Sequence, residues 1–365
     1  MRVLFTGGGT GGHIYPALAL ARYLRANVGA DVLFVGTQRG MENDIVPAAG
    51  FPLEKIPVVG LQRKLSLQAG RALFLAASSV WAAKRIIKTY RPDVVVGTGG
   101  YVAGPVVLAA RMSRIPTVIH EQNAIPGLTN VVLSRFATRV CLSFAGSESY
   151  FPRPERLVLT GNPRATEAAQ ASGADADDVA LLPDVPVLLC VGGSHGALTL
   201  NEVFSASVGQ VLDGCDAQVV YVTGRRYYDD ILANLQGVLA RYPHRLHILP
   251  YHPALPGLMR KTDLMVSRAG ATTLAEITAL GVPSVLVPSP NVTNNHQEHN
   301  ARALSEHGAA VLLTERQLTE SRLSELLITL LSKKEKLQQM QASCRSLGVV
   351  DAAERMAAVI REIIV

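Results

Sequence analysis

Short apolar runs rich in β-branched residues alternate along this chain with longer segments in which apolar residues recur at helical spacing. The first kind is typical of strands buried on both faces, and the second of helices that cover a sheet. The pattern predicts strands at 2–5, 31–35, 53–57, 93–96, 117–120, 139–142, 157–159, 187–191, 217–222, 246–249, 263–267, 283–287 and 309–313. It predicts helices near 16–27, 41–48, 68–89, 103–112, 128–136, 318–332 and 351–363, with a further helical run from Leu200. Such alternation indicates the α/β class.

Glycine-rich stretches follow three of the predicted strands, at Thr6–His13, Gly97–Tyr101 and Gly192–Ala197. Glycine tolerates positive φ and lets backbone N–H groups close on an anion at the start of the following helix, which Pro16 is predicted to open after the first loop. One such loop would suit an ordinary strand-to-helix turn. Three of them favour two α/β domains that face anionic ligands across a cleft.

Length and one compositional break also indicate two domains. The chain has 365 residues, of which 48% are hydrophobic and 18% charged, which is enough for two cores at about 150 residues per domain. From Ala165 to Asp184 the sequence turns to Ala, Gly, Ser and Asp, which predicts an interdomain linker. After this stretch the alternation of strands and helices repeats.

Cysteine usage and hydropathy favour a cytosolic protein. The four cysteines, Cys141, Cys190, Cys215 and Cys344, form no CxxC pair, so we expect reduced, buried thiols and neither disulfides nor a zinc site. The glycine loop begins at residue 6, and we therefore expect no signal peptide. The longest apolar uncharged run, 94–110, is broken by glycines and a proline, which predicts strand, loop and helix in place of a transmembrane helix.

Positive charge is concentrated in the first half of the chain. Residues 1–160 carry 18 Lys and Arg against 8 Asp and Glu, and residues 161–365 carry 17 against 21. Eight bases and no acids lie between Glu54 and Asp93, interleaved with apolar residues. This segment fits a helix resting on an anionic bilayer and equally an ordinary amphipathic helix whose apolar side is core. The membrane face would carry Leu73, Phe74, Trp81, Lys84, Arg85 and Lys88. Nucleic acid is disfavoured, because the aromatic residues are not arranged to stack bases.

A predicted helix start in the second half is a candidate phosphate site. Arg268–Glu276 follows a strand, so the amides of Ala271, Thr272 and Thr273 would point toward a phosphate. Glu276 falls one turn further on and would reach a ribose hydroxyl. The alternative is a capping box, because Thr273 and Glu276 fit the S/T-x-x-E pattern.

Other polar clusters lie where predicted strands end. Pro288–Ala301 is dense in amides, which suit a polyhydroxyl ligand such as a sugar. Its His296 and His299 lack a supporting acid cluster, so a metal is disfavoured. Asp175 and Asp177 match the Asp-x-Asp of metal-dependent sugar transferases, but in the predicted linker they favour a solvated spacer.

Histidines lie at two of the glycine loops. His13 and His195 would either hydrogen-bond the loop or move protons, since the unperturbed pKa of histidine lies near 6.5. The polar cluster His120–Asn123 follows another predicted strand and would face the same cleft.

Six motifs together resemble the MurG family. They are Gly7–His13, Gly97–Pro105, His120–Asn123, Gly161–Arg164, Gly192–Ala197 and Arg268–Thr272, in the family's order over residues 1 to about 310. The family comprises GT-B-type transferases that add N-acetylglucosamine to undecaprenyl-diphospho-muramoylpentapeptide (lipid I) to make lipid II for peptidoglycan. The resemblance implies an acceptor- and membrane-binding Rossmann-like domain at 1–163, a UDP-sugar-binding one at 164–340, and a helix at 341–365 that returns to the first.

The same resemblance implies which residues bind the substrates. They are Thr10, Gly11, Gly12, Asn123, Arg164, Ser194, His195, Tyr251, His252, Ala271, Thr272, Thr273, Glu276, His296 and Gln297. Within this set the backbone at Tyr251–His252 would hold uracil, Glu276 the ribose and Gln297 the sugar hydroxyls. At His195 and His296 the family often has glutamine, and some members carry one more residue between Pro163 and Arg164. These departures leave the exact sugar contacts open.

An inverting transfer needs a base for the acceptor hydroxyl and stabilisation of the departing UDP. Helix N-termini and Arg side chains supply the second without a divalent ion, so we expect neither a metal nor a cofactor. His13 is the first candidate base, because a helix N-terminus keeps its ring neutral, and Tyr101 and Glu121 are in reserve. The alternatives are a UDP-N-acetylglucosamine 2-epimerase and a non-catalytic nucleotide-sugar sensor at the membrane.

The implied partners follow from this reaction. They are UDP-N-acetylglucosamine, lipid I, the anionic surface on the cytoplasmic face of the cell membrane, and cell-division or elongation proteins.

Overall fold

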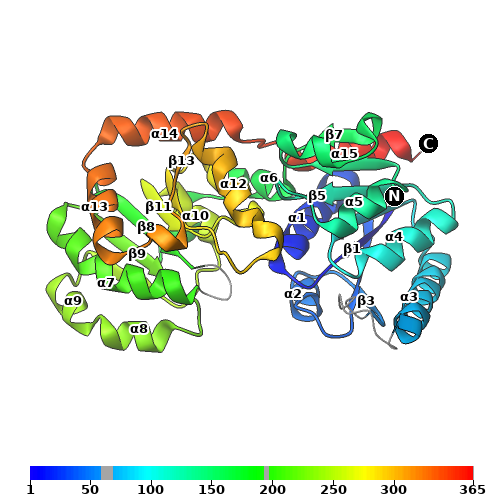
Figure 1. The fold of residues 1–365 in the computed structure, drawn as a ribbon, viewed down its shortest axis with the longest axis horizontal. Coiled ribbons are helices and arrows are strands. Elements are labelled where there is room, and N and C mark those ends of the chain that lie inside the picture. The colour runs from blue at the N-terminus through cyan, green and yellow to red at the C-terminus, as the bar shows by residue number, and fades with distance from the viewer. Residues whose placement is uncertain (59–68, 193–196, 365) are drawn as a thin grey trace. The chain divides into compact units, whose positions relative to one another are not determined.

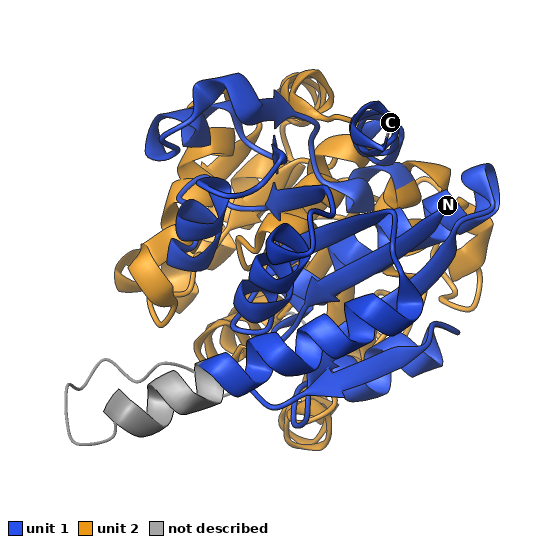
Figure 2. Ribbon diagram, turned by 90° about the vertical axis from the view of Figure 1, so that its right-hand side faces the viewer, with its two compact units in different colours: residues 1–166, 351–365 blue, residues 167–350 orange. Residues whose placement is uncertain are grey.

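The structure is a computed structural model that describes residues 1–58, 69–192 and 197–364, with only the backbone described for 69–76. It divides into two compact units (Figure 2). Unit 1 comprises Met1–Thr166 and Asp351–Val365, and unit 2 comprises Glu167–Val350. Each unit is built on a parallel sheet, and the prediction of two Rossmann-like α/β units is confirmed.

Unit 1 has, within the described residues, a seven-stranded sheet in the order β3-β2-β1-β4-β5-β6-β7 (Figure 1). Its strands are β1 (Arg2–Gly7), β2 (Asp31–Thr37), β3 (Leu53–Ile56), β4 (Val94–Gly99), β5 (Thr117–Glu121), β6 (Arg139–Leu142) and β7 (Leu157–Leu159). Its helices are α1 (Gly11–Val28), α2 (Glu42–Ala48), α3 (Ala69–Tyr90), α4 (Ala103–Met112), α5 (Leu128–Ser134) and α15 (Ala352–Ile363), while α6 (Pro163–Gln170) contains the boundary to unit 2.

Helices cover both faces of this sheet, because successive strand residues point to opposite sides. Val3 and Phe5 belong to a core that includes residues of α1 and α15. Leu4, between them, belongs to a second core with residues of α3, α4 and α5. All three side chains are fully buried, which is why the central strands are continuous apolar runs in the sequence.

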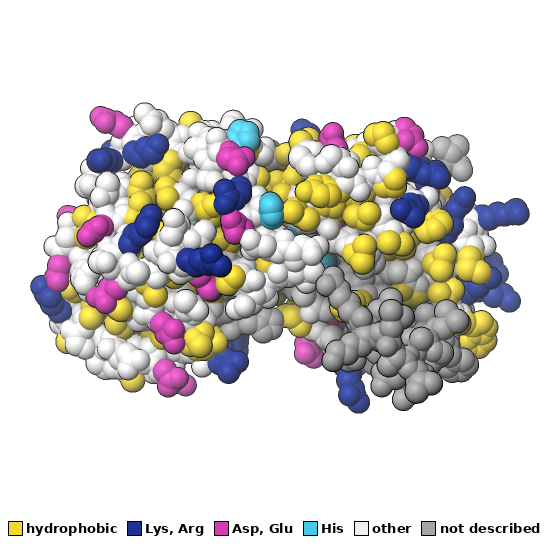
Figure 3. Space-filling model, in the orientation of Figure 1, with side chains coloured by type: hydrophobic (Ala, Val, Ile, Leu, Met, Phe, Trp, Pro, Cys, Tyr) yellow, Lys and Arg dark blue, Asp and Glu magenta, His cyan; other side chains and the backbone are white. Residues whose placement is uncertain are grey.

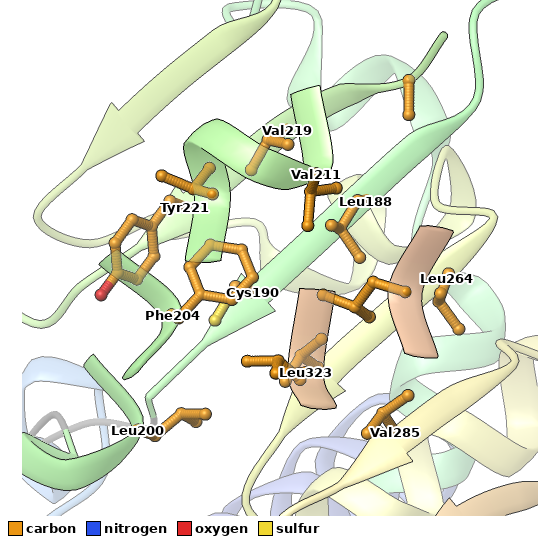
Figure 4. Close-up of a cluster of buried hydrophobic side chains, with 14 of the residues drawn as sticks. Leu188, Cys190, Leu200, Phe204, Val211, Val219, Tyr221, Leu264, Val285 and Leu323 are labelled. Atoms are coloured by element: carbon orange, nitrogen blue, oxygen red, sulfur yellow. The ribbon is translucent and has the colours of Figure 1, made fainter. Parts of the chain in front are cut away.

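Unit 2 has, over its described part, a six-stranded sheet in the order β10-β9-β8-β11-β12-β13. Its strands are β8 (Val187–Val191), β9 (Gln218–Val222), β10 (Leu246–Leu249), β11 (Leu264–Ser267), β12 (Ser284–Leu286) and β13 (Ala310–Leu312). Its helices are α7 (Leu198–Gly214), α8 (Tyr228–Asn234), α9 (Gln236–Arg241), α10 (Leu255–Arg260), α11 (Ala271–Leu280), α12 (His296–Ser305), α13 (Glu320–Leu331) and α14 (Lys334–Leu347). Figure 4 shows its main core, where Leu188 and Cys190 of β8 lie among Phe204, Tyr221 and Leu323.

The helix after the first glycine loop begins earlier than the sequence predicts. It starts at Gly11, and Pro16 lies inside it. Glycine is a poor helix former, so the sequence did not predict a helical turn at Gly11 and Gly12. Proline is common at the first position of a helix, so Pro16 suggested that the helix begins there.

The predicted linker at 165–184 is largely ordered by local hydrogen bonds. Its first residues belong to α6, and a 3₁₀ turn at Gly173–Ala176 (η3) follows. Ser172 and Asp175 form a capping box on this turn, and Lys261 pairs with Asp177 at 2.5 Å. Both carboxylates are exposed, as the prediction of a solvated spacer requires, although each also takes part in a local contact.

The helix predicted at 351–363 is confirmed as α15, whereas residues 341–347, which were expected to belong to the same returning segment, are the end of α14. α14 ends at Leu347, and α15 begins at Ala352. A side chain at Gly348 would put its Cβ 2.6 Å from the Thr278 carbonyl oxygen, so only glycine fits at this turn. None of the helices in the described ranges is long and apolar enough to cross a membrane.

Candidate functional site

The two glycine loops of unit 1 lie side by side. β1 and β4 are neighbours in the sheet, and the strand order reverses between them, so the loops leave the sheet at its topological switch point. This is where open α/β sheets bind ligands. A Cβ on Gly100 would collide with the Gly8 carbonyl, and one on Gly7 with the Thr98 hydroxyl. The absence of side chains therefore lets the loops pack against each other.

His13 lies in the first turn of α1, against the second glycine loop. Its Nδ1 is 3.1 Å from the Gly8 carbonyl oxygen and 3.3 Å from the Thr10 hydroxyl. A carbonyl only accepts, so Nδ1 carries the proton and the basic lone pair is on Nε2. A Cβ on Gly99 would lie 2.9 Å from this Nε2, and the Thr98 hydroxyl donates to the His13 carbonyl at 2.8 Å. These contacts define both the position and the tautomer of the imidazole.

Glu121 ends β5 and is surrounded by donors. Its Oε1 accepts from the Asn123 amide at 2.9 Å and from the Asn123 side chain at 3.2 Å. Its Oε2 accepts from the Gly127 amide at 3.1 Å and from the Asn130 side chain at 2.8 Å. The carboxylate is 1% exposed. These bonds make Glu121 the anchor of the loop after β5, and they weaken its candidacy as the base.

His120 is fully buried beside Glu121 and has a structural role. Its Nε2 is 3.1 Å from the Gly161 carbonyl oxygen, and its Nδ1 is 3.1 Å from the amide nitrogen of Gln122. Burial lowers the pKa of His120 to about 4, and the Gly161 carbonyl opposes this only in part. The ring is therefore neutral at physiological pH.

The remaining predicted residues of unit 1 lie around the same edge. Thr10 and Gly12 are exposed and Gly11 is half-buried, at the start of α1. Tyr101, in the second glycine loop, is 63% exposed. The Arg164 guanidinium lies 6.0 Å from the centre of the Tyr15 ring of α1.

Glu42 is a buried residue of this site that the sequence did not reveal. Its carboxylate accepts from the Gly9 amide of the first glycine loop at 3.0 Å and from the Thr37 amide at 2.9 Å. No local motif marks such a contact, because Glu42 opens α2, more than thirty residues after the loop. The available signal was the glycines at positions 8, 36 and 40, which make room for this side chain.

In unit 2, the helix start predicted to bind phosphate has the expected geometry. Gly270 is the N-cap residue of α11 and contributes no side-chain cap, so the first-turn amides of Ala271 to Thr273 have no intrahelical partners. The Thr272 hydroxyl is buried and has no hydrogen-bond partner among the described residues. A buried hydroxyl without a partner beside uncapped amides fits an anion bound at this position.

The capping-box alternative for Thr273 and Glu276 was wrong. Thr273 lies two residues beyond Ala271, the first residue of α11, whereas a capping box needs its Ser or Thr at the N-cap. Glu276 is 5% exposed within the helix. Arg268, just before the helix, pairs with Glu315 at 2.5 Å and donates to the Val287 carbonyl at 3.1 Å.

The other predicted residues of unit 2 are held by local contacts. Gln297 Oε1 accepts from the Ser289 amide at 2.8 Å, and His296 Nδ1 donates to the Thr293 carbonyl at 2.9 Å. Tyr251 is 49% exposed, with the Arg225 guanidinium 5.2 Å from its ring centre.

His252 is the last predicted residue of unit 2 that the structure describes. His252 is buried, and its Nε2 donates to Asp178 at 3.1 Å, which lowers the pKa of that carboxylate. Ser194 and His195 lie outside the described residues.

Across the described ranges, no group of three or more His, Cys, Asp and Glu side chains could hold a metal ion. That the chemistry needs no metal and no cofactor stays a prediction.

Two parallel-sheet Rossmann-like units in one chain match the GT-B architecture of glycosyltransferases. The chain belongs to glycosyltransferase family 28, whose N-terminal domain matches residues 3–142 and whose C-terminal domain matches residues 187–356. It is also 43% identical over 365 residues to a protein of Halalkalibacterium halodurans, covering 100% of this chain and 99% of that one. A relative from Desulforamulus reducens is 46% identical over 356 residues, or 96% of each chain. Both are named UDP-N-acetylglucosamine--N-acetylmuramyl-(pentapeptide) pyrophosphoryl-undecaprenol N-acetylglucosamine transferase.

Solved structures agree with this assignment. The crystal structure of Acinetobacter baumannii MurG is 32% identical with a TM-score of 0.78, covering 99% of both chains. A UDP-GlcNAc 2-epimerase from Neisseria meningitidis, bound to UDP-GlcNAc, has a TM-score of 0.71 but only 13% identity. The second likeness shows a shared fold and does not favour the epimerase alternative.

Proposed function

We propose that this chain is an inverting glycosyltransferase that moves N-acetylglucosamine from UDP-N-acetylglucosamine to the C4 hydroxyl of the muramoyl sugar of lipid I. The product is lipid II, the precursor used for peptidoglycan in cell growth and division. The observation that carries the proposal is the 43% and 46% sequence identity, over nearly the whole chain, to enzymes named for this transfer. Two features support it, each within its own unit: the uncapped helix start in unit 2 and the histidine held by the first glycine loop in unit 1.

Unit 2 would hold the donor. The amides of Ala271 to Thr273 and the Thr272 hydroxyl would bind the diphosphate, because they are donors at the positive end of α11. Glu276 would accept from the ribose. The Gln297 carbonyl is engaged by Ser289, which orients its NH₂ group for a sugar hydroxyl. The backbone at Tyr251–His252 would hold the uracil.

Unit 1 would hold the acceptor, with His13 as the base. Nε2 of His13 would take the proton of the C4 hydroxyl as its oxygen attacks C1 of the donor sugar. The bond from C1 to the diphosphate breaks, and UDP leaves with the electron pair, stabilised by the helix start in unit 2. Thr10, Gly11, Gly12 and Asn123 would line the path of the transferred sugar, and Arg164 would meet the diphosphate.

An assay with UDP-N-acetylglucosamine and a short-chain lipid I analogue tests the reaction. A transferase adds one N-acetylhexosamine to the analogue, detected by mass spectrometry, and releases UDP. A 2-epimerase would instead convert the donor to UDP-N-acetylmannosamine without the acceptor. A non-catalytic sensor would bind the donor in calorimetry and release no UDP.

The membrane face would be the outer side of α3. Ala83 and Ile87 point into the core, whereas Trp81 is 64% exposed and Lys84 and Lys88 are exposed beside it. The buried side of α3 is ordinary core, and its exposed side is the one that would rest on the membrane. Lys and Arg side chains gather at the right-hand edge in Figure 3, where α3 lies in Figure 1. The side chains of Leu73 and Phe74 lie outside the described residues.

A hollow of about 780 Å³ beside this helix supports an anionic surface as the partner. Its lining includes Trp81, Lys84, Arg85, Lys88 and Arg91, and no acidic residue lines it among those described. Bases beside an exposed tryptophan suit lipid phosphates at the interface. We place the protein on the cytoplasmic face of the cell membrane, where division or elongation proteins would also meet it.

A further inference from the structure

We propose that Glu42 is a positioning residue for the transfer: its carboxylate occupies the anion site of the first glycine loop and, through the Gly8–Gly9 peptide group, holds the His13 imidazole. This inference rests on the proposed function, because His13 matters only if unit 1 carries the base.

The carboxylate is enclosed by the loop and by β2. Oε2 accepts from the Gly9 amide at 3.0 Å, and Oε1 accepts from the Thr37 amide at 2.9 Å and hydroxyl at 2.6 Å. Glu42 is fully buried. A Cβ on Gly8 or Gly36 would lie 2.6 Å from its side-chain atoms. A loop whose composition predicts anion binding therefore already holds an anion of the protein itself.

One peptide group connects this carboxylate to the candidate base. The N–H of Gly9 donates to Glu42, and the C=O of the same peptide, from Gly8, accepts from Nδ1–H of His13. A peptide group is planar, so fixing its N–H also fixes the direction of its C=O. Hydrogen bonds in such a chain polarise one another, and a carboxylate at one end makes the carbonyl at the other a better acceptor. The arrangement orients the imidazole and favours its protonated form once Nε2 takes a proton.

The carboxylate is charged at neutral pH. Burial alone would raise the pKa of Glu42, but the hydrogen bonds from the Thr37 hydroxyl and from the Gly9 and Thr37 amides outweigh it and lower the pKa. The positive φ of Gly9, 82°, belongs to the loop that presents this amide.

A merely structural role predicts a different result from a positioning role, and two matched variants separate them. In Glu42→Gln, the remaining carbonyl oxygen serves the two donors of Thr37, so the new NH₂ group faces the Gly9 N–H. In Thr37→Val, one hydrogen bond to the same carboxylate is lost while the Gly9 contact remains. Glu42→Gln sets two donors against each other, whereas Thr37→Val loses one hydrogen bond, so we expect a lower melting temperature in both and the larger fall in Glu42→Gln. Both variants are therefore assayed at a temperature at which each is folded.

The two variants are compared by kcat with the lipid I analogue, by the Kd for UDP-N-acetylglucosamine in calorimetry, and by hydrogen exchange of the Gly9 amide. We expect Glu42→Gln to lower kcat at least tenfold more than Thr37→Val, with the Kd unchanged and Gly9 exchange accelerated only in Glu42→Gln. Equal kcat values for the two variants, or unchanged Gly9 exchange in Glu42→Gln, would overturn the proposal. If Glu42→Gln does not fold, Glu42→Asp replaces it in the comparison. Its side chain is one methylene shorter, so the carboxylate lies further from the Gly9 amide, and we expect the same loss of kcat and the same faster Gly9 exchange.

Failure of the transferase function itself would show differently. The parent protein would then form no product, and the exchange measurement alone would decide whether Glu42 holds the loop. Product formation by the parent with no difference between the variants would leave the function standing and refute only the role of Glu42.

Discussion

Replacing Glu121 tests whether this carboxylate anchors the loop after β5 or acts on the substrate. Glu121→Ala removes four hydrogen bonds. The groups that donated them differ in whether water can replace the lost acceptor. The Asn130 amide is 3% exposed, so it keeps an unmade hydrogen bond, whereas the amides of Gly127 and Asn123 can turn to solvent. One stranded buried donor costs about 2 kcal/mol, and the three replaceable hydrogen bonds together with the small cavity add about 2 kcal/mol. We therefore expect Glu121→Ala to lower the free energy of unfolding by roughly 4 kcal/mol.

The isosteric variant Glu121→Gln decides between the two roles. The glutamine side chain keeps one acceptor oxygen, but its NH₂ group replaces the second oxygen and faces the donors that this oxygen served. We therefore expect the free energy of unfolding, measured in urea, to fall by about 2 kcal/mol. Activity measured where the variant is folded should stay within tenfold of the parent. Asn130→Ala is the matched control, because it removes one donor and leaves the carboxylate in place. An unchanged unfolding curve together with a loss of 10²-fold or more in kcat, absent in Asn130→Ala, would make Glu121 the base and refute the anchor role.

Four further perturbations test the rest of the site. His13→Ala should lower kcat by roughly 10²–10⁴-fold with the donor Kd unchanged in calorimetry; a drop under tenfold in a folded variant excludes it as the base. Glu276→Ala should raise the donor KM and weaken discrimination against the TDP-sugar, and unchanged donor kinetics would remove its ribose role. Lys84→Glu/Arg85→Glu should reduce cosedimentation with anionic liposomes and its salt dependence, since each base near the surface contributes about 1 kcal/mol; equal binding by variant and parent rejects this face. Because the folded pKa of His120, about 4, lies below its ordinary value, the unfolded chain binds the extra proton. Stability should therefore fall by about 3 kcal/mol as the pH drops from about 6.5 to about 4, and His120→Gln should flatten this pH dependence of chemical unfolding.

The sheets could be predicted from sequence because their strands are buried on both faces. Val94, Val95 and Val96 of β4 are all fully buried, so the run is apolar without interruption and stands out from the helices around it. The ligand edges were predictable for a related reason. Parallel strands end at one edge, so polar or glycine-rich residues after them gather there. Neither inference needs any contact between residues distant in the sequence.

Contacts between distant residues are what the sequence could not provide. Arg268 precedes a helix start that suits phosphate, yet its guanidinium pairs with Glu315, which no spacing rule connects to it. Thr273 and Glu276 fit a capping pattern, but the N-cap is Gly270, because the end of β11 determines where the chain turns into α11. Asn294 and Asn295 adopt left-handed backbone conformations with φ of 54° and 49°, which asparagine tolerates and which let α12 begin at His296.

The same limit explains why two helix starts that look alike in sequence differ in what they offer a ligand. Both follow a parallel strand and a glycine, so composition alone assigns each an anion. In unit 1 the Gly9 amide is already engaged by Glu42, whose charge a second anion at the same amide would oppose. In unit 2 no side chain of the described residues caps α11, and the buried Thr272 hydroxyl has no hydrogen-bond partner among them. If the proposed sites are correct, a diphosphate would find its donors at α11, whereas the carboxylate of Glu42 already accepts from the first loop, which also bonds the candidate base His13.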